Sequence, residues 1–283
     1  RPPRSTLFPY TTLFRSVAWI AASTELNRRY ELRKVLGIGL RAVVFLAFDR
    51  REEREVTIKL LRKMLSDQAA LLREFHAEAD MLRRVRSNVV VPLQGVDIWD
   101  DMPFLVFAFG EARNLYQLAA TENFTETEIL KIAYAIGCGL NAMKQQGMLH
   151  CNIKPENILF RDGQYYVSEF GLITPLEAPY DNSNFPYWGD AAFSSPEFFL
   201  SGATLNSRSD IYSLAMLLYT FIKSENPFYG YDYEESRRRR DLPDLLSFEH
   251  MTTSVGRPIQ SLLVAMLDLR PEEIGRASCR ERV

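Results

Sequence analysis

The chain has 283 residues, of which 47% are hydrophobic and 25% charged, and its formal net charge is −2. This length and composition predict a globular protein with one large two-lobed domain or two smaller domains. The near-neutral charge argues against nucleic acid as a partner, and the sequence contains no apolar run of the roughly 20 residues that a membrane-spanning helix needs.

Both ends of the sequence look foreign to the rest. Residues 6–16 read TLFPYTTLFRS and residues 273–283 read EIGRASCRERV. These stretches resemble translations of one sequencing-library adapter, the first of one strand and the second of its reverse complement. Because cloning scars are set aside in reasoning about a fold, we expect residues 1–16 and 273–283 to be artefactual. The domain is then expected within residues 17–272, cut short at its C-terminal end.

The first part of the domain is predicted to be rich in strands. Residues 30–59 carry alternating and β-branched apolar residues on both sides of the charged turn RREER, a pattern typical of consecutive hairpins. Apolar residues at helical spacing predict a helix over residues 71–85. The apolar runs at residues 88–93 and 104–107 predict two further strands.

From residue 110 onward the pattern becomes helical. A long helix is predicted over residues 125–146, where the opening TETE resembles a capping segment. The compact loop HCNIKPENILF follows, then a short strand pair around residues 165–167 and helices over residues 211–223 and 259–267. Strands first and helices later predict an α+β fold with two lobes, a small β-rich N-lobe at about 28–109 and a larger helical C-lobe at about 110–272.

The earliest chemical motif is a pair of glycines, Gly37 and Gly39, between two strand patterns. A dinucleotide-binding loop would be followed by a helix, whereas the residues after Gly39 predict a strand. A strand, a glycine turn and a second strand are typical of the phosphate-covering flap of protein kinases. Lys59 ends the apolar strand VTIK, which resembles the kinase VAIK strand. A lysine there needs an anion nearby, because an unpaired buried charge is costly.

The most specific stretch is HCNIKPEN at residues 150–157, which resembles the catalytic loop HRDxKPEN. SEFG at residues 168–171 stands where that family has DFG, and SPE at 195–197 where it has APE. Asp210 matches the aspartate that anchors the catalytic loop. With these motifs in order, residues 30–272 resemble the catalytic domain of a eukaryotic-type protein kinase of the Ser/Thr class.

The resemblance implies ATP and Mg²⁺ as cofactors and a protein as substrate or partner. Lys59 would contact the α- and β-phosphates and pair with Glu78, while Lys154 would contact the γ-phosphate. Asn157 and Glu169 would hold the magnesium ion. The residues implied to line the nucleotide site are Gly37, Gly39, Val44, Thr57, Lys59, Phe107, Ala108, Phe109 and Leu159.

Three positions that bear on phosphate transfer depart from the family pattern. Asn152 replaces the catalytic aspartate, and an amide cannot hold the substrate proton near neutral pH. Glu169 replaces the magnesium-binding aspartate and is one methylene longer, so weaker metal binding is expected. Cys151 replaces the arginine that would pair with an activation-loop phosphate, and a thiol offers no such cation. We expect Cys151 to be a buried, inert thiol.

These departures favour a pseudokinase that binds ATP and acts as a regulatory or scaffolding module through a protein partner. Two alternatives stay open. The chain could be a slow but active Ser/Thr kinase, in which Asn152 positions the hydroxyl. It could also be a nucleotide-free interaction module whose pocket is closed by Phe107 and Thr57.

The remaining signals concern location and stability. Three cysteines without paired spacing predict neither a disulfide framework nor a zinc site, so a reducing, cytoplasmic location is expected, with membrane attachment open through segments beyond this sequence. The arginine run at residues 237–240 is flanked by acidic residues and predicts a solvated face. Glu197 is expected to lack its partner, because the family's late arginine would fall near residue 274.

Overall fold

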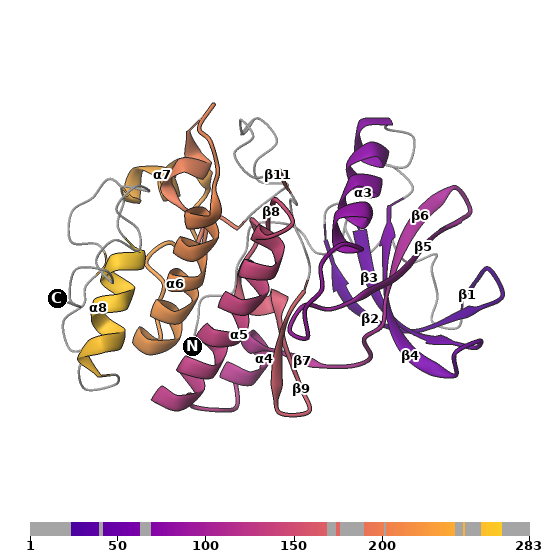
Figure 1. Cartoon of the computed structure of the whole chain (residues 1–283), viewed down its shortest axis with the longest axis horizontal. Coiled ribbons are helices and arrows are strands. Elements are labelled where there is room, and N and C mark those ends of the chain that lie inside the picture. The colour runs from indigo at the N-terminus through magenta and orange to yellow at the C-terminus, as the bar shows by residue number, and fades with distance from the viewer. Residues whose placement is uncertain are drawn as a thin grey trace. The chain divides into compact units, whose positions relative to one another are not determined.

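The computed structural model (Figure 1) describes residues 24–39, 42–62, 69–168, 174–175, 190–200, 202–240, 246 and 256–267. The chain divides into two compact units. The first unit holds Arg1–Arg84 and Val91–Ala112, and the second holds Val85–Val90 and Arg113–Val283. The segments predicted to be foreign lie outside the described residues, as do Glu169, Phe170 and Gly171 of the SEFG motif.

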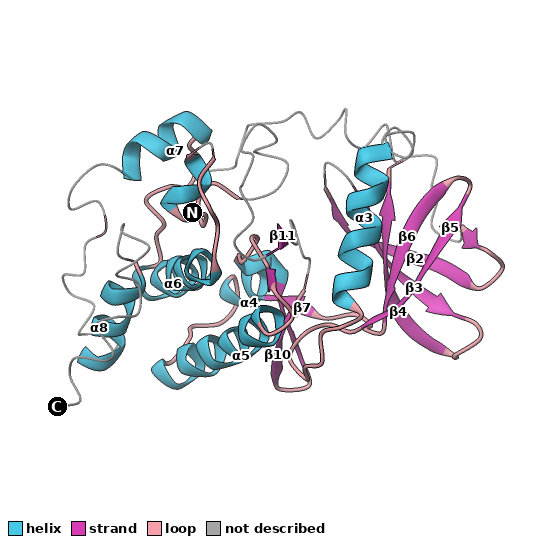
Figure 2. Cartoon of the chain, turned by 45° about the horizontal axis from the view of Figure 1, so that its top comes forward, coloured by secondary structure: helices cyan, strands magenta, loops and turns pink. Residues whose placement is uncertain are grey.

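The first unit is built on one antiparallel sheet with the strand order β1-β2-β3-β4-β6-β5. The strands are β1 (Glu25–Leu26), β2 (Tyr30–Ile38), β3 (Ala42–Asp49), β4 (Arg54–Leu61), β5 (Leu93–Trp99) and β6 (Met102–Phe107), and helix α3 (Ala69–Leu82) lies beside the sheet (Figures 1 and 2). Along β4 the core residues alternate, with Val56, Ile58 and Leu60 at most 1% exposed. This period of two is what a half-buried strand requires.

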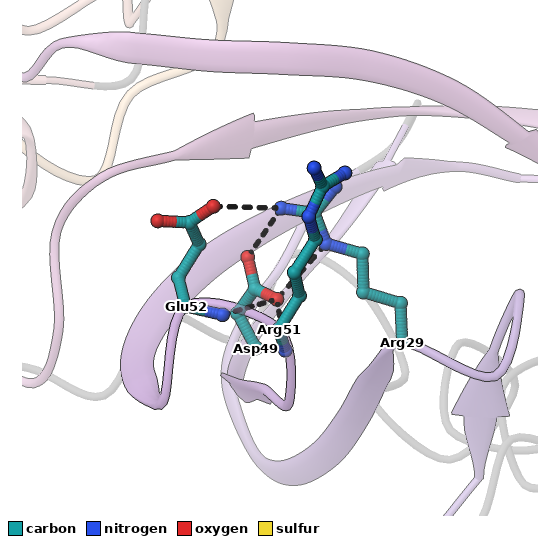
Figure 3. A network of polar contacts seen from close by, with 4 residues as sticks. All are labelled: Arg29, Asp49, Arg51 and Glu52. Carbon is teal, nitrogen blue, oxygen red and sulfur yellow. Dashed lines mark hydrogen bonds and ion pairs between the residues drawn. The ribbon is translucent and has the colours of Figure 1, made fainter.

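A buried carboxylate stabilises the turn that joins β3 to β4 (Figure 3). Asp49 is fully buried and accepts two hydrogen bonds from the Arg29 guanidinium, at 2.9 and 2.8 Å. The backbone amides of Arg51 and Glu52 also donate to Asp49, at 3.0 and 3.4 Å. Burial alone would raise the pKa of Asp49, but these hydrogen bonds outweigh it, so the pKa lies below its ordinary value.

The second unit is mostly helical, as Figure 2 shows by colour. Its helices are α4 (Leu115–Ala119), α5 (Glu126–Lys144), α6 (Ser207–Lys223), α7 (Tyr233–Arg240) and α8 (Arg257–Met266), with short 3-10 helices η1 (Pro155–Asn157) and η3 (Pro196–Phe199). Strands β7 (Arg113–Asn114), β9 (Ile158–Arg161) and β10 (Gln164–Val167) form one small sheet, and β8 (Met148–Leu149) pairs with β11 (Thr174–Pro175). No helix among the described residues is long and apolar enough to cross a bilayer.

Helix α5 begins where the sequence predicted. The Thr125 hydroxyl accepts a hydrogen bond from the Glu128 amide, and the Glu128 carboxylate accepts one from the Thr125 amide. This reciprocal capping box satisfies two backbone donors that a helix start otherwise leaves unpaired. Farther along, a Cβ added at Gly139 would lie 2.8 Å from Cγ2 of Val167 on β10, so glycine is what lets the helix lie this close to the strand.

One local prediction was wrong, and a second was wrong at Arg240, although Arg237 and Arg238 are exposed as expected. The run at residues 88–93 is not a strand: only Leu93 belongs to β5, while Val90 forms an isolated parallel bridge with Val167 and the Val89 carbonyl accepts the Val167 amide. Val89 and Val90, which belong to the second unit, therefore lie beside β10 of that unit. The arginine run is helical, in α7, but Arg240 is only 4% exposed and does not belong to a solvated face. The Arg240 guanidinium donates to backbone carbonyls and lies over two aromatic rings of the second unit.

Candidate functional site

In the first unit, a lysine and a carboxylate form a largely buried ion pair. Lys59 Nζ on β4 lies 2.9 Å from Glu78 Oε1 on α3, and the two side chains are 14% and 13% exposed. Strand β4 lies inside the sheet, between β3 and β6, so the backbone of Lys59 is fixed on both sides. The contact expected from the sequence is present, and it compensates a charge that would be costly to bury alone.

The two glycines lie where β2 approaches β3 in the same sheet. Gly37 on β2 pairs with Val44 on β3, and Val44 pairs in turn with Lys59 on β4. The Gly39 amide donates to the Ala42 carbonyl at 2.9 Å, which closes the turn. A Cβ at Gly39 would come within 3.3 Å of that carbonyl oxygen, so a larger residue would crowd the turn.

Phe107 lies at the end of β6, and Ala108 and Phe109, which are also implied to line the nucleotide site, follow it. Phe107 is buried and lies opposite Thr57 in the sheet. The Thr57 hydroxyl donates to the Phe109 carbonyl at 2.9 Å, and the Ala108 amide donates to the Pro92 carbonyl at 3.0 Å. The Thr57 hydroxyl therefore ties β4 to the segment that follows β6.

In the second unit, a buried aspartate fixes the HCN loop. Asp210 on α6 accepts hydrogen bonds from the amides of His150 and Cys151, both at 2.8 Å. Cys151 adopts a left-handed backbone conformation with φ of 58°, which turns its amide and that of His150 toward one carboxylate. Burial raises the pKa of Asp210 to about 6, although the two amide hydrogen bonds oppose the rise. The anchoring contact expected at Asp210 is therefore present.

The backbone of Asn152 is fixed from both sides. The Asn152 amide donates to His150 Nδ1 at 3.1 Å, and the Asn157 side-chain amide donates to the Asn152 carbonyl at 2.8 Å. Because Nδ1 of His150 accepts, its Nε2 carries the proton and donates to the Ser168 carbonyl at 3.2 Å. The loop therefore has an ordered architecture around an amide side chain at position 152.

Asn157 and Leu159, two further residues of the predicted site, also belong to the second unit. The acceptor on the Asn157 side chain is its amide oxygen, a hard ligand of the type that magnesium prefers, while Glu169 lies outside the described residues. Within the ranges that the structure describes, no three or more His, Cys, Asp or Glu side chains gather as a metal site would need. Leu159 is partly buried on β9, where it pairs with Tyr166 and Asn114.

Cys151 is buried among apolar side chains. Its neighbours in this cluster are Leu149, Phe198, Phe199 and Leu205. Burial raises the pKa of the thiol well above its ordinary value, and the nearby carboxylates of Asp210 and Glu197 add to the rise. The predicted burial of the thiol is confirmed, and its inertness stays a prediction.

Glu197 has one satisfied oxygen and one that is not. Its Oε1 accepts from the Ser209 hydroxyl at 2.5 Å, while the buried Oε2 has no hydrogen-bond partner among the described residues. The position near residue 274, where the family's late arginine would fall, lies outside the described residues.

Sequence reasoning missed Asp190, which forms an ion pair with Lys154 at 3.5 Å. A carboxylate 36 positions from its partner gives no periodic or motif signal; the sequence could suggest only that an aspartate before AAFS favours a turn. Arg240 was also missed as a buried residue. It donates to the carbonyls of Ala191 and Ser194, which lie in the segment that Asp190 begins.

Comparison with known proteins gives consistent matches. The family profile described as "Protein kinase domain" matches residues 30–283. Serine/threonine-protein kinase PknL of Mycobacterium tuberculosis is 29% identical over 212 residues, covering 74% of this chain and 52% of the relative. Serine/threonine-protein kinase PrkC of Bacillus subtilis is 29% identical over 208 residues, covering 73% of this chain and 32% of the relative. The chain thus spans about half or less of the length of these curated relatives.

A solved structure shares the fold. The crystal structure of the PknI kinase domain from Mycobacterium tuberculosis matches with a TM-score of 0.64, over 90% of this chain and 93% of that chain. The sequence identity is 18%, so this likeness concerns the fold alone.

Proposed function

Because the chain belongs to the protein kinase domain family and has serine/threonine kinases among its relatives, we propose that it binds ATP and transfers phosphate poorly or not at all. The observation that carries the proposal is the catalytic loop, which keeps its anchoring contacts while Asn152 stands where a proton acceptor is needed.

The residues proposed to bind ATP come from each unit. In the first unit, Lys59 supplies a positive charge for the α- and β-phosphates, with Glu78 keeping its ammonium in place. In the second unit, Lys154 supplies a charge for the γ-phosphate, and Asn157 offers an oxygen ligand. Magnesium bound there with Glu169 would neutralise phosphate charge.

The proposed nucleotide contacts also include apolar surface. Val44, Thr57 and Leu159 would lie against the adenine, with Phe107, Ala108 and Phe109 at its edge and the turn at Gly37 and Gly39 over the phosphates. Lys59 is the cationic member of the nine residues proposed to line the nucleotide site. The partly exposed side chains of Val44 and Leu159 support this assignment.

The proposed weakness lies in proton transfer. When a hydroxyl attacks the γ-phosphorus, its proton must leave, and the amide of Asn152 can accept a hydrogen bond but not the proton. Losing general-base assistance lowers the rate by about 10²–10⁴-fold, or about 3–5 kcal/mol of barrier. Positioning and positive charge still stabilise the transition state. A chain of this kind would act through the conformation that it presents to a protein partner when ATP is bound.

A second candidate is a slow Ser/Thr protein kinase. The ordered backbone around Asn152 supports it, because the amide is held where it could orient a hydroxyl. A nucleotide-free interaction module is the third candidate, supported by buried Phe107 and by the hydrogen bond from Thr57 to Phe109. ATP binding separates the third candidate from the first two.

The test is a thermal-shift titration with ATP, with and without magnesium. ATP should raise the melting temperature of the unmodified chain. It should raise that of Lys144→Met equally, because this control removes an exposed lysine at the end of α5. It should not raise that of Lys59→Met. Absence of a shift at millimolar ATP in the unmodified chain would overturn the proposal. Lys59-dependent incorporation of phosphate into a protein substrate at an ordinary kinase rate would identify an active enzyme instead.

A further inference from the structure

Among the described residues, the Asp190 carboxylate lies beside Lys154, the lysine of the proposed catalytic loop. Asp190 Oδ2 lies 3.5 Å from Lys154 Nζ, and the two side chains are 32% and 25% exposed. Both residues belong to the second unit. Asn152, two positions before Lys154, carries no charge. The carboxylate at position 190 therefore influences the charge that this loop offers to a phosphate.

Asp190 is held in place by a tight turn. Its Oδ1 accepts the Ala192 amide at 3.0 Å, and its carbonyl accepts the amides of Phe193 and Ser194, each at 3.0 Å. The Ser194 hydroxyl donates to the same carbonyl at 2.9 Å. An aspartate that bonds its own following backbone in this way has little freedom to turn away.

A buried arginine holds the turn from the other side. Arg240 on α7 donates to the carbonyls of Ala191 and Ser194, and its guanidinium lies over the rings of Phe199 and Phe228, 4.4 and 3.9 Å from their centroids. These contacts fix the segment that carries the carboxylate. Lys154 has the longer and more flexible side chain, so in this pair the lysine is the partner that can move.

We propose that Asp190 is a specificity-determining residue of the nucleotide site, because it competes with the terminal phosphate of ATP for the Lys154 ammonium. This inference rests on the proposed function, in which Lys154 contacts the γ-phosphate. The competition lowers affinity for ATP and leaves ADP, which lacks that phosphate, nearly unaffected. A negative charge this close to a lysine also repels a second anion that approaches it.

The test compares ATP and ADP binding by isothermal titration. Asp190→Asn removes the charge and keeps an amide oxygen for the Ala192 amide, so the turn is preserved. We expect about a threefold to tenfold gain in ATP affinity and less than about a twofold change for ADP. The modest size reflects solvent screening of a pair that is about one-third exposed. In a Lys154→Met background, Asp190→Asn should produce no gain.

Two further variants make the test specific. Asp232→Asn removes a charge from a similar turn, where Asp232 Oδ1 accepts the Glu235 amide at 2.8 Å; it should leave the ATP-to-ADP ratio unchanged. Asp190→Ser keeps a short acceptor for the turn and should reproduce the gain if the asparagine variant does not fold.

The outcomes separate this inference from the function on which it rests. An equal gain for ATP and ADP, an unchanged ratio, or a gain that persists without Lys154 would overturn the role of Asp190 alone. Failure of the unmodified chain and of every variant to bind either nucleotide would overturn the proposed function and the inference together.

Discussion

Replacing Asp210 with asparagine tests how the loop at residues 150–157 is anchored. The aspartate is 4% exposed and accepts two backbone amides at 2.8 Å. The amide of asparagine can accept one of them, but its NH₂ group faces the other and leaves a buried donor unpaired. Such a donor costs about 1–3 kcal/mol. At neutral pH this loss is partly offset, because the variant no longer buries a charge.

The pH dependence gives the sharper signature. Burial raises the pKa of Asp210 to about 6 in the folded chain, above the ordinary value of about 4. Between these values the folded state binds the proton more tightly than the unfolded state, so stability rises as the pH falls through 6 toward 4. The full effect is about 3 kcal/mol, of which about 1 kcal/mol is gained between pH 8 and pH 5.

The assay is urea unfolding followed by circular dichroism at pH 5 and pH 8. The free-energy gain from pH 8 to pH 5 should be about 1 kcal/mol larger in the unmodified chain than in Asp210→Asn, because other titrating groups cancel in this comparison. Asp162→Asn, at a side chain that is 83% exposed, should behave as the unmodified chain does. An equal pH response in the unmodified chain and Asp210→Asn would refute the reasoning.

Three further predictions concern the rest of the described chain. Arg29→Met leaves the buried Asp49 carboxylate without its guanidinium and should lower the free energy of unfolding in urea by about 2–4 kcal/mol at pH 7. The lowered pKa of Asp49 stabilises the fold above about pH 4, and this stabilisation is lost in acid. The difference in stability between the two chains should therefore shrink as the pH falls below 4. Peptide mapping after treatment of the folded chain with a thiol reagent should find Cys138, which is partly exposed, modified well before buried Cys151; equal rates would contradict the burial of Cys151. Gly139→Ala should cost about 1–3 kcal/mol in thermal or urea unfolding, because its Cβ would meet a side chain at 2.8 Å, and an unchanged midpoint would show that α5 can shift away.

Much of the fold could be predicted because its signals are local. Alternation along residues 54–61 gave a strand, and the spacing of Thr125 and Glu128 gave the start of α5. The ordered motifs predicted an α+β kinase fold and a protein kinase family, and the family match and the structural likeness confirm both. The cost of an unpaired buried lysine predicted an anion near Lys59, and the resemblance to the kinase family implied that Glu78 is this anion.

The rest depends on contacts between distant segments. The four arginines at residues 237–240 look solvated by composition, yet Arg240 is buried by carbonyls and rings that come from about 12 to about 50 positions away. The Asp190–Lys154 pair carries no pattern at all, because two oppositely charged residues meet only once the turn and the loop have formed. Likewise, the apolar pattern at residues 88–93 does not distinguish a strand at a sheet edge from a segment that lies beside β10.

The most direct test of the central claim is the rate of phosphate transfer at saturating ATP and magnesium. The rate would be measured on a generic protein substrate for the unmodified chain and for Asn152→Asp combined with Glu169→Asp. We predict that the unmodified chain is slower by about 10²–10⁴-fold, the size of general-base assistance. Equal rates in the two chains, at a level normal for protein kinases, would contradict the account.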